Sequence, residues 1–453
     1  MDVINPATGE REASYEADSR EDADEALGRA AEAFREWRDR PLRERESLLQ
    51  AAGDVLRENE EEYARTMTRE MGKPITQARS EVEKCAWACD HYAEHASVYL
   101  DPDPHPSPPG SAVKTVYEPL GPVLAVMPWN FPFWQVFRFA VPYLTAGNVG
   151  LLKHASNVPG CAEAIEEVFE QAGYPEGVFQ SLLIPSDLVD DLLADDRLRA
   201  ATLTGSGSAG RAVASTAGDQ LKKTVLELGG SDPFVVLDDA DLDRAAETGA
   251  WARNQNGGQS CIAAKRFVVH ADVYDDFLDR FVKEVESLSV GDPMDEDTDV
   301  GPQARQGLLD DLHEQVEASV DAGAEVVTGG EPLDGDGAYY PPTVLTDVPE
   351  GCPADAEETF GPVAAIHEVD DEEAAVEKAN DTEFGLGASV WTADRERGER
   401  VARLIDAGCV YVNQLVKSDP RVPFGGVKES GYGRELSEIG IQEFVNRKTV
   451  WVE

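Results

Sequence analysis

The sequence WARNQNGGQSCIAAK, residues 251–265, organises the rest of the chain because it sets one cysteine behind two adjacent glycines. Gly257 and Gly258 tolerate backbone conformations that other residues resist, so we expect a sharp turn just before Cys261. A thiolate is a strong nucleophile, and a tight loop can hold it beside a backbone N–H. A lone cysteine is often only a small buried side chain, so this stretch by itself leaves catalysis and packing both open.

Length and charge narrow the classes of function. The 453 residues suffice for about three domains of ~150 residues, and 42% are hydrophobic, which allows large cores. The formal net charge of −48 would repel phosphates and an anionic membrane surface, so we expect neither nucleic acid nor membrane as a partner. Such an acidic surface suits a salt-rich cytoplasm, where ions screen its self-repulsion. An ordinary acidic cytosolic protein is the alternative.

The sequence shows no targeting or metal-binding signal. Its six cysteines are widely spaced, which does not resemble a disulfide framework and fits a reducing compartment. The N-terminus has no basic and apolar signal, and the most apolar region, residues 131–152, is interrupted by prolines, a glycine and Arg138. Cys89 and His91 would point about 200° apart on a continuous helix, so their neighbourhood is not expected to bind a metal. We therefore expect a cytoplasmic protein without a metal.

The first hundred residues are predicted to be helical. Apolar residues recur at steps of three and four from Ser19 onward, and Ser19 followed by Asp22 is a plausible helix start. The segment DPDPHPSPPG, residues 101–110, cannot form a regular helix or a central strand because of its prolines. We interpret it as a boundary loop.

Strands and helices alternate in the remainder of the chain, up to residue 227 and again from 233 to about 412. This alternation predicts parallel sheets with helices on both faces, and ligands bind such sheets at the C-terminal ends of the strands. The expected strands include VLAVM, VGLLKH, VFQSLLI, AATLTG, TVLEL, FVVL, KRFVVH and AEVVTGG. The terminal TVWVE has no strand near it in the sequence and is a candidate for adding to another subunit's sheet.

A glycine-rich turn follows one of the predicted strands. The segment LTGSGSAG satisfies the pattern G-x-G-x-x-G through Gly205, Gly207 and Gly210, and we expect a helix from about Ala209. Backbone N–H groups at such a helix start can bind a pyrophosphate, although a plain turn rich in small residues fits equally well. The strand is not the first of its sheet, so we interpret the turn as a phosphate site without assigning the ribose to Glu227.

Two further motifs carry chemically useful side chains. Glu227 lies at a strand end in LELGG, and a carboxylate near a thiolate suggests covalent catalysis in which the acid later activates water. Asn130 lies between aromatic residues in PWNFP, where its amide could stabilise an oxyanion. The alternatives are a solvated glutamate at a strand end and an ordinary turn asparagine.

Five stretches occur in one order at characteristic spacing: PWNFP, LELGG, GQSC, EETFGPV and PFGGVKESGYGRE. Together they make the chain similar to the NAD(P)-dependent aldehyde dehydrogenase superfamily over nearly its whole length. The resemblance implies that Cys261 is the nucleophile, that Asn130 and the Cys261 N–H form an oxyanion hole, and that Glu227 is the general base. It also implies a group of cofactor-binding residues: Trp129, Lys153, Ser156, Gly205, Ser206, Leu228, Glu358 and Phe360. Among them, Lys153 would contact the adenosine ribose or its phosphate, and Glu358 would hold the nicotinamide ribose.

The resemblance further implies an α/β fold with two doubly wound parallel-sheet domains and a β-arm for oligomerisation. The cofactor-binding domain would comprise residues 1–100 and 121–228, and the catalytic domain residues 229–434. Residues 101–120 and 435–453 would form the arm of a homodimer or homotetramer. The partner of the site would be a small-molecule aldehyde.

The nature of the cofactor depends on Ser156. Many NAD-preferring relatives have a glutamate at this position, three residues after the lysine, whereas this chain has the sequence KHAS. A carboxylate there would repel a 2′-phosphate, but a serine near Lys153 can accept one. NADP is therefore slightly favoured over NAD. The alternative is that Ser156 only caps the following helix.

The substrate is suggested by a resemblance to a short succinate-semialdehyde dehydrogenase branch. Arg138, eight residues after Asn130, and Ser418 match positions that bind the substrate carboxylate there, and Trp134 and Phe424 would be apolar tunnel walls or ordinary packing residues. A second carboxylate-binding arginine of some relatives is replaced by Gln255. We expect oxidation of succinate semialdehyde to succinate, with glutarate semialdehyde or an aliphatic or aromatic aldehyde as the alternative substrate.

Overall fold

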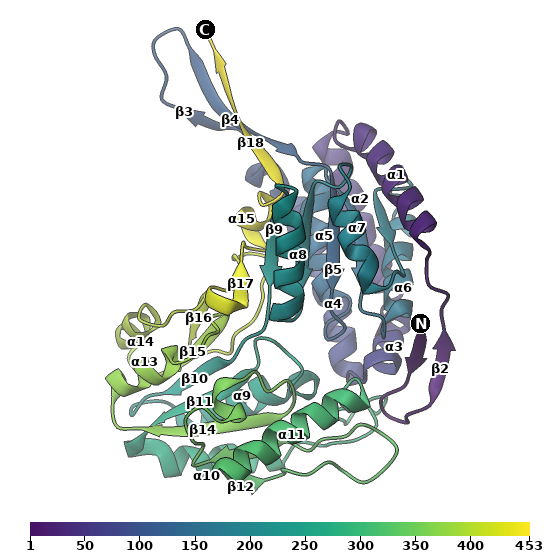
Figure 1. Cartoon of the computed structure of the whole chain (residues 1–453). Helices are drawn as coiled ribbons and strands as arrows, with labels where there is room; N and C mark the ends of the chain where they lie inside the picture. The colour runs from purple at the N-terminus through teal and green to yellow at the C-terminus, as the bar shows by residue number, and fades with distance from the viewer.

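Two sheets organise the chain in the computed structural model, which describes all residues from Met1 to Glu453 (Figure 1). The first sheet has the order β17-β9-β8-β5-β6-β7. Its strands are β5 (Pro122–Met127), β6 (Val149–His154), β7 (Phe179–Ser181), β8 (Ala200–Thr204), β9 (Lys223–Glu227) and β17 (Gly431–Tyr432). Neighbouring strands are parallel, as predicted, except that β17 runs antiparallel to β9. The two residues of β17 therefore lie on this sheet, although the expected boundaries assign them to the second domain.

Helices precede the first sheet and connect its strands. They are α1 (Arg20–Trp37), α2 (Leu42–Glu58), α3 (Glu60–Met71), α4 (Ile75–Tyr99), α5 (Trp134–Ala146), α6 (Pro159–Gln171), α7 (Val189–Ala194) and α8 (Gly207–Asp219). The predicted start of α1 is confirmed by a capping box in which Ser19 and Asp22 bond to each other's backbone N–H. The largest hydrophobic core packs these helices against the sheet and buries nearly all of α5, the helix after PWNFP.

The second sheet has the order β12-β13-β14-β11-β10-β15-β16 and is parallel except for β12. Its strands are β10 (Asp232–Val236), β11 (Ala264–His270), β12 (Glu325–Thr328), β13 (Thr343–Thr346), β14 (Val363–Val369), β15 (Gly387–Trp391) and β16 (Cys409–Val412). The helices of this unit are α9 (Leu242–Asn254), α10 (Tyr274–Glu286), α11 (Gln306–Ala322), α12 (Pro353–Ala356), α13 (Glu372–Asn380) and α14 (Arg395–Ala402). Both sheets are thus mixed but largely parallel.

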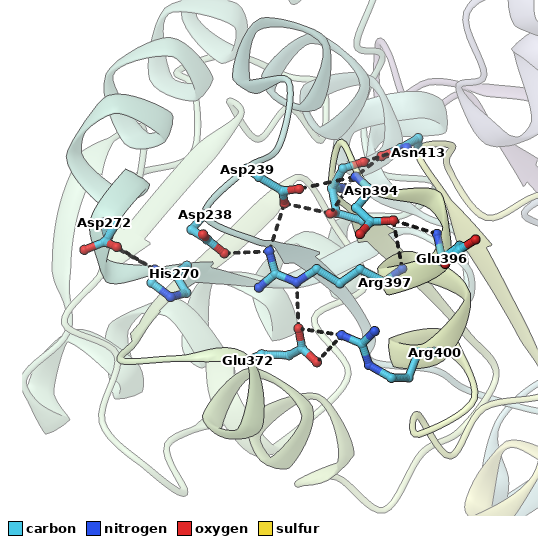
Figure 2. A network of polar contacts seen from close by, with 11 residues as sticks. Asp238, Asp239, His270, Asp272, Glu372, Asp394, Glu396, Arg397, Arg400 and Asn413 are labelled. Atoms are coloured by element: carbon cyan, nitrogen blue, oxygen red, sulfur yellow. Dashed lines mark hydrogen bonds and ion pairs between the residues drawn. The ribbon is translucent and has the colours of Figure 1, made fainter.

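An ion-pair network attaches α14 to its neighbours in the second unit (Figure 2). Arg397 on α14 contacts Asp238 at 2.7 Å and Asp239 at 3.0 Å, just after β10, and Glu372 on α13 at 2.6 Å. Arg400, one turn later, contacts the same glutamate at 3.1 Å. One guanidinium therefore joins three acidic side chains that would otherwise repel one another.

A three-stranded antiparallel arm extends from the body of the molecule (Figure 1). It consists of β3 (Asp103–His105), β4 (Ala112–Pro119) and β18 (Val445–Val452), with β4 in the centre. The proline-rich segment expected to be only a loop thus contributes the short edge strand β3, a position that tolerates proline. The terminal strand pairs along its length with β4 of its own chain, so a distant partner exists that the sequence did not reveal.

The two ends of the chain complete this arrangement. A hairpin of β1 (Asp2–Ile4) and β2 (Arg11–Ser14) begins the chain, and α15 (Ser437–Ile441) precedes β18. None of the helices combines the length and the apolar character needed to cross a membrane.

Candidate active site

The turn before Cys261 has an unusual backbone. After α9, residues 256–258 all adopt left-handed conformations, with φ of 56° at Asn256, 63° at Gly257 and 72° at Gly258. A Cβ on Gly258 would lie 2.4 Å from the carbonyl of Gly361, so only glycine allows this close approach. The sharp turn predicted from the two glycines is confirmed, and it presses the cysteine loop against the EETFGPV segment.

Side-chain amides fix the position of Asn130 relative to this loop. The Asn130 Nδ2 donates to the main-chain carbonyl of Gln259 at 3.0 Å, and the Asn256 Nδ2 donates to the Asn130 carbonyl at 2.7 Å. Both asparagines are buried, so their amides are desolvated and rigid donors. Asn256 was not identified from the sequence, and the signal available was a polar residue directly before two glycines.

Most of the predicted catalytic and cofactor residues line one cavity of about 230 Å³. The predicted residues in its wall are Trp129, Asn130, Gly205, Ser206, Leu228, Cys261, Glu358 and Phe360. The rings of Trp129 and Phe360 meet edge to face, with centroids 5.7 Å apart. A thiol, an amide donor, a glycine turn and two aromatic rings therefore face the same space.

The thiol of Cys261 is partly buried and lies in a region of mixed charge. Burial raises its pKa to about 12, while the positive charges of Arg138 and Lys265 act in the opposite direction. The Lys265 Nζ donates to the main-chain carbonyls of Ser260 and Cys261, each at 2.9 Å. Lys265 therefore holds the main chain of the nucleophile loop in place and also supplies positive charge near the thiol.

Glu358 is held against the LELGG turn. Its Oε1 accepts a hydrogen bond from the Gly230 N–H at 3.0 Å and lies 3.4 Å from the Lys265 Nζ. A Cβ on Gly229 would lie 2.4 Å from the Glu358 Oε2, so the first glycine of the pair makes room for this carboxylate. The pair Gly229 and Gly230 thus connects the first sheet to the Glu358 loop.

The glycine-rich turn joins β8 to α8, and the predicted helix is confirmed with a start at Gly207. The Ser206 Oγ accepts a hydrogen bond from the Ala209 N–H at 3.3 Å and so caps the helix. A Cβ on Gly210 would lie 2.6 Å from the Leu228 side chain, which explains the third glycine of the pattern as a packing requirement. The free N–H groups of a 13-residue helix therefore open beside Gly205 and Ser206 at the cavity.

Lys153 and Ser156 lie at the end of β6 and beyond it, outside the walls of the cavity that contains Cys261. Lys153 is buried, its side-chain amine forms no hydrogen bond or ion pair within the chain, and burial lowers the pKa of that amine. Ser156 is exposed. The cap of α6 is Val158, without a side-chain hydrogen bond, so the alternative interpretation of Ser156 as a helix cap is wrong.

Glu227 is buried at the end of β9, and neither of its carboxylate oxygens has a hydrogen-bond partner. Burial and the neighbouring Glu435 raise its pKa well above the usual range, while Arg138 and Arg434 act against this rise. A Cβ on Gly425 would lie 2.5 Å from the Glu227 Oε1. The carboxyl group thus lies beside the Gly425 segment and is not part of the wall of the Cys261 cavity.

The four predicted substrate-binding residues lie outside that cavity wall and form two pairs, Arg138 with Phe424 and Trp134 with Ser418. The guanidinium of Arg138 forms an ion pair with Glu435, and both side chains are almost fully buried, at 2% and 0% exposure. Its Cζ also lies 4.7 Å from the ring centroid of Phe424. Glu435 was not identified from the sequence, although it is the last residue of the quoted PFGGVKESGYGRE. The charge of Arg138 is therefore already balanced within the protein.

The second pair is Trp134 and Ser418. The Trp134 Nε1 donates to the Ser418 Oγ at 2.8 Å, and the Lys84 Nζ donates to the same oxygen at 3.0 Å. Lys84 was not identified from the sequence, because its contact spans 334 residues. The structure thus brings a third polar residue to the expected substrate-binding group.

Known proteins resemble this chain in sequence and in fold. A profile of the Aldehyde dehydrogenase family matches residues 1–450. A Synechocystis protein named probable succinate-semialdehyde dehydrogenase, NADP(+), is 54% identical over 450 residues, covering 99% of each chain. The succinate-semialdehyde dehydrogenase, NADP(+), of Mycobacterium avium is 50% identical over 453 residues, covering 99% of this chain and 96% of that protein. Among solved structures, succinic semialdehyde dehydrogenase from Streptococcus pyogenes in complex with NADP+ has a TM-score of 0.97 at 38% identity, covering 100% of this chain and 99% of that one.

Proposed function

Because this chain belongs to the aldehyde dehydrogenase family, we propose that it oxidises succinate semialdehyde to succinate, with NADP as the hydride acceptor. The observation that carries the proposal is the single cavity that Cys261 shares with Asn130, the glycine-rich turn and Glu358. Relatives that share 50–54% of their residues over the full length are named for this activity and this cofactor.

The cofactor-binding role rests on groups that lack partners within the chain. The N-terminus of α8 beside Gly205 and Ser206 suits a pyrophosphate, because its N–H groups and helix dipole favour an anion. Lys153 is a buried cation without a counter-ion, which suits a 2′-phosphate. Glu358 would accept hydrogen bonds from the nicotinamide ribose, with Phe360 beside the ring. When bound, NADP supplies the hydride acceptor.

The first chemical step would occur at Cys261. Its thiolate adds to the aldehyde carbon, and the carbonyl oxygen becomes the oxyanion of a thiohemiacetal. Asn130 Nδ2 and the Cys261 N–H would stabilise that oxyanion, and loss of one such donor typically costs about 3 kcal/mol. Loss of hydride from the same carbon leaves a thioester on Cys261.

The second step would use Glu227 as a general base. Water attacks the thioester, Glu227 takes a proton from the water, and the carboxylic acid leaves while the cysteine is regenerated. Both carboxylate oxygens of Glu227 lack partners and the pKa of the group is raised, which suits a group that accepts and releases a proton. This route to hydrolysis argues against a CoA-acylating enzyme.

The substrate assignment is tested by a matrix of aldehydes and cofactors. The purified protein is expected to reduce NADP with succinate semialdehyde at a kcat/KM well above that for glutarate semialdehyde, propanal or benzaldehyde, followed at 340 nm. The pairing of Arg138 with Glu435 is the observation that favours the alternative, a broader aldehyde dehydrogenase, because it lowers the charge left for a substrate carboxylate. Equal kcat/KM for all four aldehydes would support that alternative.

We also propose a cytoplasmic homodimer or homotetramer, with residues 101–120 and 435–453 as the oligomerisation arm. The outer edge of β18 has no partner strand, and Trp451 and Val452 on it are exposed, which supports pairing with a second subunit. Residues 1–100 with 121–228, and 229–434, would be the cofactor-binding and catalytic domains. Light scattering of the full chain, compared with a variant truncated before residue 445, tests the role of the arm.

A further inference from the structure

Burial lowers the pKa of five lysines, which are Lys73, Lys84, Lys153, Lys222 and Lys265. Three of them are bonded within the chain, to a carboxylate or to main-chain carbonyls. Lys84 and Lys153 form no ion pair within 4 Å. A buried cation costs free energy unless an anion compensates it. Under the proposed function Lys153 meets a cofactor phosphate, which leaves Lys84, a partly buried lysine, without an assigned anion.

Lys84 lies on α4 at a point where that helix packs against α5 and the segment after β16. Its Nζ is 3.0 Å from the Ser418 Oγ and 4.3 Å from the ring centroid of Trp134. The Ser418 oxygen accepts one hydrogen bond from Lys84 and a second from the Trp134 Nε1. Both lone pairs of the hydroxyl are then engaged, so its own hydrogen is free to donate.

The cluster of Lys84, Ser418 and Trp134 therefore presents donors only. Lys84 has two further N–H groups and Ser418 has its O–H, whereas the nearest carboxylate on the same loop, Asp419, is bonded to Arg421 at 2.6 Å. Glu81, one turn earlier on α4, is likewise engaged, because it accepts from the Phe133 and Trp134 N–H groups at 2.9 Å and pairs with Lys73. Such a group of donors fits an oxyanion, and a carboxylate above all.

Arg138 relates this cluster to the nucleophile. It lies on α5 one turn after Trp134, and its Nη2 donates to the Oγ1 of Thr204 at 3.4 Å. Thr204 lines the cavity that contains Cys261. Glu435 balances the charge of Arg138 but does not pair with Lys84. One end of a short substrate would thus lie at Cys261 and the other at the cluster, with Arg138 between them.

We propose that Lys84 is a specificity-determining residue, whose ammonium group together with the Ser418 hydroxyl binds the carboxylate at the far end of the aldehyde substrate. This inference rests on the proposed function and deepens it. Some relatives bind the substrate carboxylate with a second arginine where this chain has Gln255. The proposal places the corresponding positive charge on α4, at Lys84.

The test compares two substrates of the same chain length, succinate semialdehyde and butanal, which lacks the carboxylate. The Lys84→Met variant removes the charge and keeps a similar length, and it is expected to lower the ratio of the two kcat/KM values about 30- to 100-fold, mainly through KM. Lys84→Arg is expected to retain most of the ratio. Lys283→Met, at an exposed position on α10, is the matched control and should leave the ratio unchanged.

A pH profile separates direct binding from a structural role. Burial and the repulsion of Arg138 lower the pKa of Lys84 to about 8, with Cys85, Glu81 and Asp419 acting in the opposite direction. In the wild-type enzyme the substrate ratio should therefore fall about tenfold from pH 7 to pH 9 as Lys84 loses its charge. In Lys84→Arg the ratio should stay flat over that range, because a guanidinium remains protonated. Groups such as Cys261 that act on both substrates change both kcat/KM values equally with pH, so their titration does not affect the ratio.

Each outcome decides the matter. A Lys84→Met variant that loses both substrates equally, or a wild-type ratio that does not change with pH, overturns the role of Lys84 while leaving the proposed function intact. A wild-type enzyme that shows no preference for succinate semialdehyde over butanal overturns the proposed substrate, and the role of Lys84 falls with it. Melting temperatures of all variants check that each one is folded.

Discussion

At the scale of single residues, the thiol of Cys261 is protonated at neutral pH. Burial raises its pKa to about 12, and the nearby charges of Arg138 and Lys265 only partly oppose this rise. The thiolate is the reactive form, so activation has to accompany the binding of cofactor or substrate. A positively charged nicotinamide ring near the thiol would stabilise the thiolate and so lower the pKa of Cys261.

Alkylation of Cys261 is therefore expected to be slow in the cofactor-free enzyme. The rate with iodoacetamide should rise about tenfold per pH unit from pH 7 to pH 10, without a plateau, because the thiolate fraction grows throughout that range. Mass spectrometry of the peptide that contains Cys261 measures this rate, with Cys261→Ala as the control for the other five cysteines. A plateau near pH 8 would contradict the raised pKa.

Replacement of Glu227 should separate the two chemical steps. Glutamine cannot accept a proton, so Glu227→Gln is expected to lower kcat by about 10²- to 10⁴-fold by slowing hydrolysis of the thioester. Hydride transfer precedes that step, so stopped-flow absorbance at 340 nm should show a burst of about one NADPH per subunit. Cys261→Ala should give no burst, and loss of the burst in Glu227→Gln as well would place Glu227 before hydride transfer.

The exposed residue Ser156 offers a test of cofactor choice. A carboxylate at this position would face the 2′-phosphate near Lys153, so Ser156→Glu is expected to lower kcat/KM for NADP about 10- to 100-fold and to leave NAD nearly unaffected. Ser156→Gln keeps the size of the side chain without its charge and should change the preference little. A wild-type enzyme with a hundredfold preference for NAD would refute the assignment of NADP.

At the scale of elements, Arg397 joins α14 to α13 and to the residues after β10 (Figure 2). Its side chain is only 19% exposed, whereas that of Arg400 is 58% exposed. Arg397→Met is expected to lower the free energy of unfolding by about 1–2 kcal/mol, because it leaves three carboxylates facing one another. Arg400→Met should cost less than 0.5 kcal/mol, as exposed ion pairs usually do. Denaturant unfolding measures the free energy of unfolding of both variants. Equal losses would contradict the larger contribution expected of the less exposed Arg397.

The elements themselves could be predicted well from the sequence. The alternation of apolar strands and amphipathic helices is a local property, so the parallel parts of both sheets, the cap at Ser19 and the turn at Gly257 and Gly258 follow from neighbouring residues. The pairing of β18 with β4 is different, because strand partners far apart in the chain are chosen by the whole fold. β3 was missed as well, because it lies in a proline-rich segment and itself contains Pro104, which an edge strand tolerates.

At the scale of the whole molecule, the sequence predicts which residues form the candidate site better than it predicts the contacts between them. Cys261, Asn130 and Glu358 carry recognisable motifs and do line one cavity. The pairing of Arg138 with Glu435 and the contact of Lys84 with Ser418 join segments about 300 residues apart, and no local pattern encodes them. Buried charges find partners through packing, and this part of the site needed the structure.

The net charge of −48 belongs to the whole molecule as well. Acidic side chains outnumber basic ones by 88 to 40, so the folded chain repels itself at low salt. The melting temperature is expected to rise between 0.05 and about 1 M KCl, as the screening length falls to roughly 3 Å. Differential scanning calorimetry measures this rise, and a flat or falling melting temperature would reject a chain adapted to a salt-rich cytoplasm.

The position of β17 has a consequence for how the protein is made. This strand closes the first sheet against β9, yet its residues follow the entire second unit in the chain. During synthesis β9 therefore remains an open edge until the whole second unit has been translated, and Glu435 emerges only after β17. A nascent polypeptide that terminates before β17 lacks both the strand that covers the edge of β9 and the glutamate that balances Arg138. Such a truncated product would have an incomplete active site.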